Sequence, residues 1–170
     1  MTCRVTLTMT CLAVLLVAMP LLLQPVPNLV WNASSSVPIG LYSVRPTNIH
    51  HVGDLVVVRP PEALAAFLDT RRYLARGVPL LKHIAGLPGQ IVCRIGHTVT
   101  VDGVTMGQAL DRDRIGRLLP IWDGCRCVAD QEVFLMNWQS ENSLDGRYLG
   151  PLSASTIVGR AHPLWLVDDH

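Results

Sequence analysis

The sequence predicts a mainly β domain of antiparallel sheets with one short helix, preceded by a single N-terminal transmembrane helix. Residues 5–23 carry no charged side chain, and from Gly40 onward short apolar runs alternate with turn residues. The first pattern is typical of a membrane span and the second of β-strands. A chain of 170 residues is also about the length of one domain. We therefore expect an anchor and link at residues 1–31 and one folded domain at residues 32–170.

The anchor is predicted from length and charge. Its 5–23 run approaches the ~20 apolar residues that cross a bilayer as a helix. A cleaved secretory signal is the alternative, but the run exceeds the usual apolar core of such signals, and Gln24-Pro25-Val26-Pro27 is a poor cleavage site. Arg4 precedes the run and favours a cytoplasmic N-terminus, while Trp31 falls where an interfacial aromatic residue is expected on the far side. We expect residues 5–23 to contact membrane lipid in a single pass.

The remaining elements follow from alternation and turn signals. A link at residues 24–29 contains prolines that cannot easily continue a helix. A helix is predicted to begin at Pro61 and to extend towards Tyr73, because helix formers follow an N-terminal proline. Asp102-Gly103 is a strong turn signal, and residues 107–130 are predicted to form a long surface excursion. Six strands are predicted, at residues 41–44, 54–59, 91–95, 99–101, 132–136 and 156–160.

Charge and cysteine content limit the partners and cofactors. The net charge is +1 and the arginines are scattered along the sequence, so we expect no nucleic-acid partner. In an oxidising compartment Cys93 could pair with Cys125 or with Cys127, which would leave one free thiol. Zinc binding by Cys125 and Cys127 is a weak alternative, because their C-x-C spacing lacks the usual two intervening residues. We expect no cofactor and no metal.

The chain has one lysine, Lys82, in the apolar stretch 78–89. An ammonium in apolar surroundings can lose its proton near neutral pH, whereas a guanidinium does not. Lys82 is therefore the candidate for a neutral amine base. Ser34, Ser35 and Ser36 precede Val37-Pro38 and offer hydroxyls on a segment stiffened by proline. Taken alone, the serines could be a polar linker and Lys82 a surface residue.

A third polar stretch, residues 140–150, contains Ser143, Asp145 and Arg147, and taken alone it could be a surface loop. Together the three stretches supply what a serine peptidase needs. These requirements are a hydroxyl nucleophile, a base to take its proton, a group to orient that base, and donors for the oxyanion. A serine with a lysine is a known variant of the serine–histidine arrangement.

These segments resemble the type I signal peptidases, and specifically the TraF-type peptidases of bacterial conjugative transfer systems. Residues 32–42 are similar to that family's nucleophile segment, in which serine stands two residues before proline and Gly-Leu-Tyr follows. Residues 82–89 are similar to its general-base segment, 142–150 to its third motif, and 53–58 to its Gly-Asp strand. The match spans about Asn32 to Trp165 with the motif order preserved. Two departures are Gln90, where the family has aspartate, and Gly146, where it has serine.

The resemblance implies roles for six residues. Ser36 would be the nucleophile and Lys82 the general base. Ser34 would lend its hydroxyl to the oxyanion hole, Ser143 would orient Lys82, and Asp145 and Arg147 would form a supporting ion pair.

The resemblance also implies a place and a substrate. The protein would lie in the bacterial inner membrane with a periplasmic catalytic domain, and it would contact the conjugative transfer apparatus. Its substrate would be a membrane-inserted precursor protein, namely a pilin precursor. The product would be either a cleaved linear chain or a chain whose ends are joined into a ring.

Three alternatives remain open at this point. A general type I signal peptidase would act on many exported proteins, but such enzymes usually have methionine after the serine and proline three residues on. A non-catalytic, membrane-anchored assembly factor would keep the fold without the chemistry. A self-cleaving repressor-type Ser–Lys protease would need a DNA-binding module and no anchor.

Overall fold

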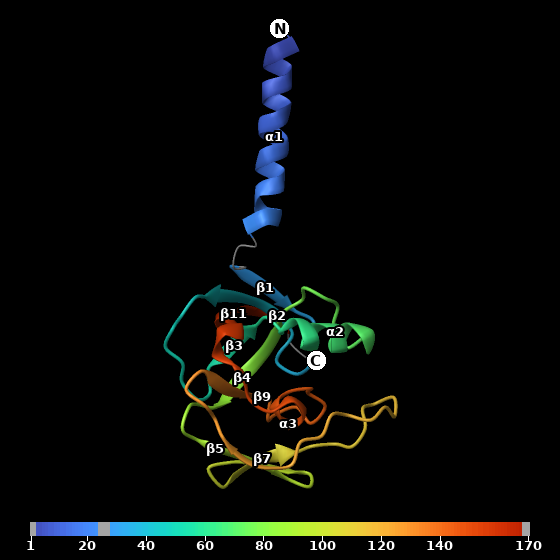
Figure 1. Cartoon of the computed structure of the whole chain (residues 1–170), viewed down its shortest axis with the longest axis vertical. Coiled ribbons are helices and arrows are strands. Elements are labelled where there is room, and N and C mark those ends of the chain that lie inside the picture. The colour runs from blue at the N-terminus through green and yellow to red at the C-terminus, as the bar shows by residue number, and fades with distance from the viewer. Residues whose placement is uncertain (1–2, 24–27, 168–170) are drawn as a thin grey trace.

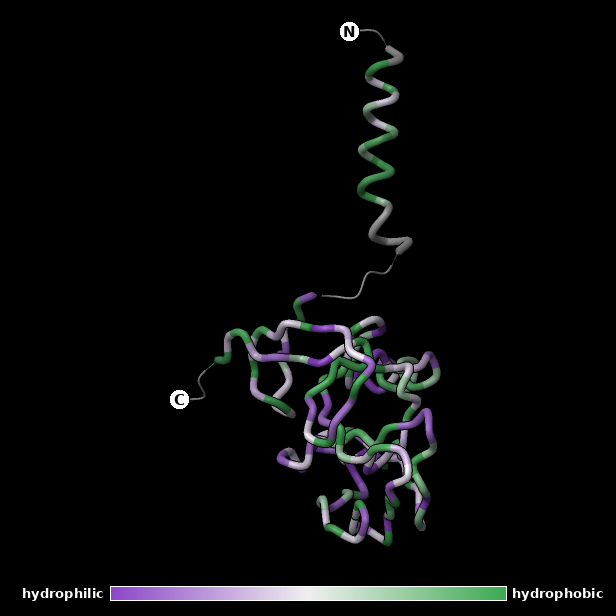
Figure 2. Tube along the Cα trace, turned by 90° about the vertical axis from the view of Figure 1, so that its left-hand side faces the viewer, coloured by the Kyte–Doolittle hydropathy of each residue, from purple (hydrophilic) through white to green (hydrophobic). Residues whose placement is uncertain are grey.

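The computed structural model describes residues 3–23 and 28–167. Helix α1 (Cys3–Leu23) projects away from a β domain that contains the remaining described elements (Figures 1 and 2). Apolar side chains along α1 are exposed; Leu7, Leu15 and Val17 each keep more than half of their surface accessible. Residues 24–27 of the predicted link lie outside the described residues.

The predicted transmembrane span is not supported by the structure. Among the described residues, no helix is long and apolar enough to cross a membrane.

The β domain consists of two antiparallel sheets. The larger has the strand order β1-β2-β11-β3-β4-β9-β10 and the smaller has the order β7-β6-β5-β8. In Figure 1 the larger sheet lies towards α1, and the smaller one forms the far end. The strands are β1 (Leu29–Asn32), β2 (Gly40–Arg45), β3 (Leu55–Val58), β4 (Leu80–Gly86), β5 (Ile91–Ile95), β6 (Thr98–Val101), β7 (Val104–Gln108), β8 (Gly124–Cys127), β9 (Glu132–Met136), β10 (Leu152–Ser153) and β11 (Ile157–Leu166).

The core divides between the two faces of the larger sheet and the space under the smaller one. Alternation along β3 sends Val57 to one buried cluster and Val56 and Val58 to another. A third cluster joins the smaller sheet to β9, and Phe134 and Met136 are fully buried in it. Strand β9 of the larger sheet therefore packs against the smaller sheet.

The six predicted strands are all present, and the Asp102-Gly103 turn joins β6 to β7. The predicted helix is α2 (Glu62–Thr70), with Pro61 as its N-cap. It ends before Tyr73 because Arg72 takes a left-handed backbone conformation with φ 54°, while the Arg71 N–H donates to the Phe67 carbonyl. Two further elements were not predicted, because each is too short to show a helical period. They are the helix α3 (Gly146–Leu149) and a 3-10 turn (Ala154–Thr156).

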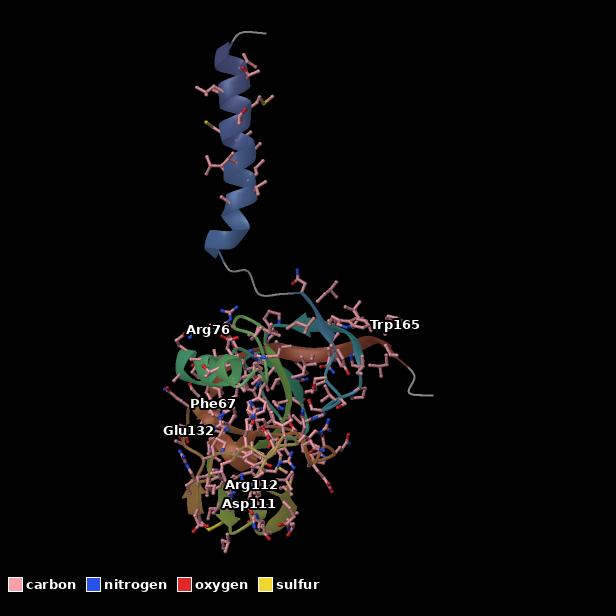
Figure 3. All side chains as sticks on the ribbon, turned by 90° about the vertical axis from the view of Figure 1, so that its right-hand side faces the viewer. Phe67, Arg76, Asp111, Arg112, Glu132 and Trp165 are labelled. Carbon is pink, nitrogen blue, oxygen red and sulfur yellow. A yellow bond between two sulfur atoms is a disulfide. The ribbon has the colours of Figure 1, made fainter. Side chains whose placement is uncertain are left out.

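The prediction of a surface excursion over residues 107–130 is wrong in part. This segment contributes β8, which pairs with β5, and it buries Leu119 and Val128. A disulfide joins Cys93 to Cys125 across the β5–β8 pair, and Cys127 is free and exposed (Figure 3). Of the two pairings that the sequence leaves open for Cys93, the structure therefore has the one with Cys125. Periodicity could not show β8, because its Gly-Cys-Arg-Cys sequence has no apolar alternation.

Candidate active site

The serine segment is a short loop between β1 and β2. The Ser34 and Ser36 hydroxyl oxygens lie 2.8 Å apart in a hydrogen bond, and the Ser36 N–H donates to Ser34 Oγ at 3.2 Å. Ser34 is exposed and Ser36 is half-buried, while the following Val37 is packed in the core. The loop is thus anchored on one side of Ser36 and open on the other.

Asn32 holds the shape of this loop. Its side-chain amide donates to the carbonyl oxygens of Ser34, Val37 and Pro38 at 2.8, 3.0 and 3.0 Å. Its Oδ1 accepts from the Ser34 N–H at 3.1 Å, and only 7% of the residue is exposed. This role of Asn32 was not predicted from the sequence. The signal available was an asparagine that ends a strand next to a turn, since asparagine side chains often bond nearby backbone.

Lys82 lies on β4, which is an interior strand of the larger sheet between β3 and β9. On β4 it pairs with Val56 of β3, so its side chain lies on the sheet face that carries fully buried Val56 and Ile84. Its Nζ donates to Ser143 Oγ at 2.6 Å, and 5% of the residue is exposed. Burial lowers the pKa of Lys82 from 10.5 to about 8; nearby Asp145 raises it and Arg147 lowers it further.

Hydrogen bonds from the Ser143 backbone to neighbouring residues hold Ser143 in place. Its N–H donates to the Ser140 carbonyl at 3.3 Å, and its carbonyl accepts from Arg147 at 3.2 Å. The Arg147 guanidinium also donates to the Ser140 carbonyl at 2.6 Å and forms a salt bridge with Asp145 at 2.9 Å. Both members of this pair are at most 1% exposed. The buried pair thereby holds the loop that presents Ser143 to Lys82.

Asp145 has two further bonds that tie the loop to the fold. Its carboxylate accepts from the Asn137 N–H at 3.0 Å, and it caps α3 by accepting from the Arg147 N–H at 3.2 Å. Arg94 of β5 donates to the Arg147 carbonyl at 2.7 Å. The loop is therefore connected to both sheets.

Two adjoining cavities meet at the serine loop. The first, which we call the lysine cavity, has a volume of about 420 Å³ and is lined by Ser36, Lys82 and Ser143 together with apolar residues that include Leu68 and Leu81. The second, which we call the arginine cavity, has a volume of about 430 Å³. Its charged lining residues are Arg71, Arg72, Asp113, Arg114 and Arg117. Ser34, Ser36 and Ser143 line both.

The structure thus brings Ser34, Ser36, Lys82 and Ser143 to one place, with Asp145 and Arg147 behind them. Within the described part of the chain, the hydrogen bonds of Lys82 Nζ and Ser36 Oγ go to Ser143 and Ser34, and none joins the two directly.

The two departures from the expected motifs have structural reasons. A Cβ atom on Gly146 would lie 2.6 Å from the Phe134 ring and 2.7 Å from the Leu135 carbonyl oxygen, so a serine there would require β9 to shift. Gln90 accepts from the Leu87 N–H at 2.8 Å and donates to Asp102 at 2.7 Å. Both changes lie away from Ser36 and Lys82.

Comparison with known proteins identifies the family of this chain. The family model described as "Signal peptidase, peptidase S26" matches residues 2–166. The chain belongs to this signal peptidase family. Members of the family are peptidases, and the serine and lysine segments lie within the matched range.

Several curated relatives are similar to this signal peptidase family member over most of its length. A conjugal transfer protein TraF of Agrobacterium tumefaciens (strain 15955) is 35% identical over 79% of this chain and 80% of the relative. A probable conjugal transfer protein TraF of Sinorhizobium fredii is 36% identical over 76% of this chain and 73% of the relative. A plasmid transfer protein TraF of Escherichia coli is 29% identical over 78% and 80%. Among solved structures, a signal peptidase I of Enterococcus faecalis V583 is 17% identical, with a TM-score of 0.39, over 69% of this chain and 98% of that one.

Proposed function

We propose that this chain is a serine endopeptidase in which Ser36 is the nucleophile and Lys82 the general base, and that it processes an exported precursor of a conjugative transfer system. The observation that carries the proposal is the buried Lys82, whose amine opens into the same cavity as Ser36. Family membership supports the reaction class, and the names of the curated relatives support conjugation.

The geometry around Lys82 suits a neutral base. A neutral amine has one lone pair, and the bond from Lys82 Nζ to Ser143 Oγ uses an N–H while leaving that lone pair available. For the proposed reaction, the Ser36 hydroxyl has to leave Ser34 and reach this lone pair within the lysine cavity that both residues line. Lys82 would then take the hydroxyl proton as Ser36 Oγ attacks the substrate carbonyl, and it would return that proton to the leaving amine.

Ser34 fits the expected oxyanion role. Once Ser36 Oγ has turned away, the Ser34 hydroxyl proton is free to be donated to the oxyanion, while Ser34 Oγ still accepts from the Ser36 N–H. Removal of one such donor typically costs about 10²–10³ in rate. A Ser34→Ala protein should therefore be impaired but measurable.

The test uses cells that lack the chromosomal or plasmid copy and carry one variant each. Ser36→Ala and Lys82→Arg should leave the precursor uncleaved, because the first removes the nucleophile and the second a base that can be neutral. Ser35→Ala is the matched control, since its side chain has no hydrogen bond among the described residues, and it should process the precursor normally. Normal processing by Lys82→Arg would contradict the proposal, and acylation of Ser36 by a serine-directed probe would separate an enzyme from a non-catalytic assembly factor.

The pilin precursor is the proposed substrate, and water or an amine could resolve the acyl-enzyme. Mass spectrometry of the pilin from cells with and without this protein distinguishes the outcomes. A product lighter than the linear chain by one water is a ring. A precursor of another exported protein that accumulates instead would identify a general signal peptidase.

We also propose that the protein is held at the bacterial inner membrane with the β domain in the periplasm. The charge-free run of residues 5–23 supports this. So do the exposed side chains of Trp31 and Trp165, whose ring centroids lie 5.8 Å apart. Figure 3 shows Trp165 at the end of the β domain nearest α1. Fractionation and protease protection of the tagged full chain test this placement; recovery in the soluble fraction would contradict it.

A further inference from the structure

The arginine cavity joins two segments that are distant in the sequence. Arg71, Arg72 and Tyr73 follow α2, and Asp113, Arg114 and Arg117 belong to the loop between β7 and β8. The arginines are scattered along the sequence, whereas the fold brings four of them together in one cavity beside Ser36. The only acidic residue among those that line it is Asp113.

Two of the four arginines are used to build the wall. Arg117 donates to Asp113 at 2.6 Å and to the Arg71 carbonyl at 2.7 Å, and it lies over the Tyr73 ring at 4.5 Å. Arg71 donates to the Leu118 carbonyl and lies over the Phe67 ring at 5.0 Å. These bonds fix the loop against the end of α2.

The Asp113 carboxylate accepts four hydrogen bonds from the residues that line this side of the cavity. Its carboxylate accepts from the Tyr73 hydroxyl at 2.6 Å, from Arg117 Nε at 2.6 Å, and from the N–H groups of Ile115 and Arg117 at 3.0 and 2.8 Å. These hydrogen bonds lower the pKa of Asp113 well below its usual value against the opposing effect of desolvation. Asp113 is therefore not available to neutralise a further cation.

Arg72 and Arg114 remain without a partner. In the part of the chain that the structure describes, neither side chain forms a hydrogen bond or an ion pair, and both are exposed at the cavity that also contains Ser36. The overall net charge of the chain is +1, so this local excess of positive charge is not a general property of the surface. The lysine cavity on the other side of the serine loop has Lys82 as its charged lining residue.

We propose that Arg72 and Arg114 bind a carboxylate of the peptide substrate, so that the arginine cavity selects an acidic group on one side of the scissile bond. This inference rests on the proposed peptidase function, since it assigns the cavity to that substrate. A carboxylate matches the planar donor pair of a guanidinium. Leu110, Ile115 and Leu119 line the same cavity and would contact apolar residues next to that group.

The carboxylate could come from an acidic side chain or from a chain terminus. Binding of short peptides to the full chain in detergent distinguishes these sources. The probes are Ac-Ala-Glu-Ala-amide, its Gln and Lys counterparts, and Ac-Ala-Gln-Ala with a free carboxyl terminus. Binding is measured by calorimetry on the Ser36→Ala protein, which cannot react, so the result does not depend on whether the protein is a peptidase.

We expect the Glu peptide or the free-acid peptide to bind more tightly than the neutral and Lys peptides. Exposed ion pairs contribute up to about 1 kcal/mol, so Arg114→Glu should weaken binding of the acidic peptide roughly 5-fold. The double change Arg72→Gln with Arg114→Glu should weaken it further, and added salt should reduce the preference in the parent protein. Tighter binding of the free acid alone would identify a chain terminus as the source.

Arg45→Glu is the matched control. Arg45 is exposed on β2, has no side-chain partner among the described residues, and does not line the cavity. The proposal is overturned if the acidic, neutral and Lys peptides bind equally or none binds, or if Arg45→Glu weakens the acidic peptide as much as Arg114→Glu does.

Discussion

Replacement of Lys82 by methionine should abolish activity and stabilise the fold at neutral pH. Burial lowers the pKa of Lys82 from 10.5 to about 8. At pH 7 the lysine is charged in both the folded and the unfolded chain, and the folded chain bears the cost of burying that charge. This lowering of the pKa corresponds to a penalty of about 3 kcal/mol on the stability of the folded chain at pH 7. Methionine removes this penalty. It also removes the hydrogen bond to Ser143, which destabilises the folded variant by about 1 kcal/mol.

The sign of the pH dependence follows from proton counts. Between pH 8 and 10.5 the unfolded chain holds a proton on Lys82 that the folded chain has released, so the parent becomes more stable as pH rises through this window. Below pH 8 both states are protonated and the penalty is constant. The advantage of Lys82→Met should therefore be about 2 kcal/mol at pH 7, vanish at about pH 9.5, and reverse to a deficit of about 1 kcal/mol towards pH 10.5.

Urea unfolding of both proteins at pH 7, 9 and 10, followed by tryptophan fluorescence, measures this difference. Only the difference between the two proteins is interpreted, because other groups titrate equally in both. Ser143→Ala is the control that removes the hydrogen bond but keeps the lysine, and it should not become more stable than the parent at pH 7. A stability difference between Lys82→Met and the parent that stays constant from pH 7 to 10 would refute the reasoning.

Three further outcomes are expected. The kcat/KM of the parent should rise with pH to a plateau with a midpoint near pH 8, because in the proposed mechanism only a neutral Lys82 can accept the Ser36 proton; a flat profile between pH 6 and 9 would contradict this. Asn32→Ala should lower kcat by about 10²-fold with little change in KM or in the pH midpoint, since it releases the loop that orients Ser36, and steady-state kinetics across pH measures this. Arg147→Met should destabilise the domain by about 3–5 kcal/mol in urea unfolding, because it leaves the buried Asp145 unpaired; a loss below 1 kcal/mol would show that the pair is not needed for the fold.

The strands were predictable where local pattern and environment agree. Val56, Val57 and Val58 form a continuous apolar run in the sequence, and in the structure all three are fully buried within the larger sheet. β8 was not predictable, because its pairing depends on β5 and on the Cys93–Cys125 disulfide. Local sequence carries no trace of a partner strand about thirty residues away.

The candidate site shows the same division. The order of the serine, lysine and Ser143 segments was readable, because each lies in a short contiguous motif. The arginine cavity was not, since it depends on a turn at Arg72 and a loop at Asp113 that meet only in the fold. The role of Asn32 lay between these cases: the residue was within the motif, but its bonds to three carbonyls depend on how the loop folds back.

If Lys82 is the base that we propose, the arrangement around it explains how a charged pair can lie behind an amine that must become neutral. Asp145 raises the pKa of Lys82 and Arg147 lowers it, so the two effects oppose each other. What remains is burial among apolar residues, which favours the neutral amine. The pair therefore positions Ser143 without holding Lys82 in its charged form, whereas a lone carboxylate in the same place would have stabilised the ammonium and opposed its proposed use as a base.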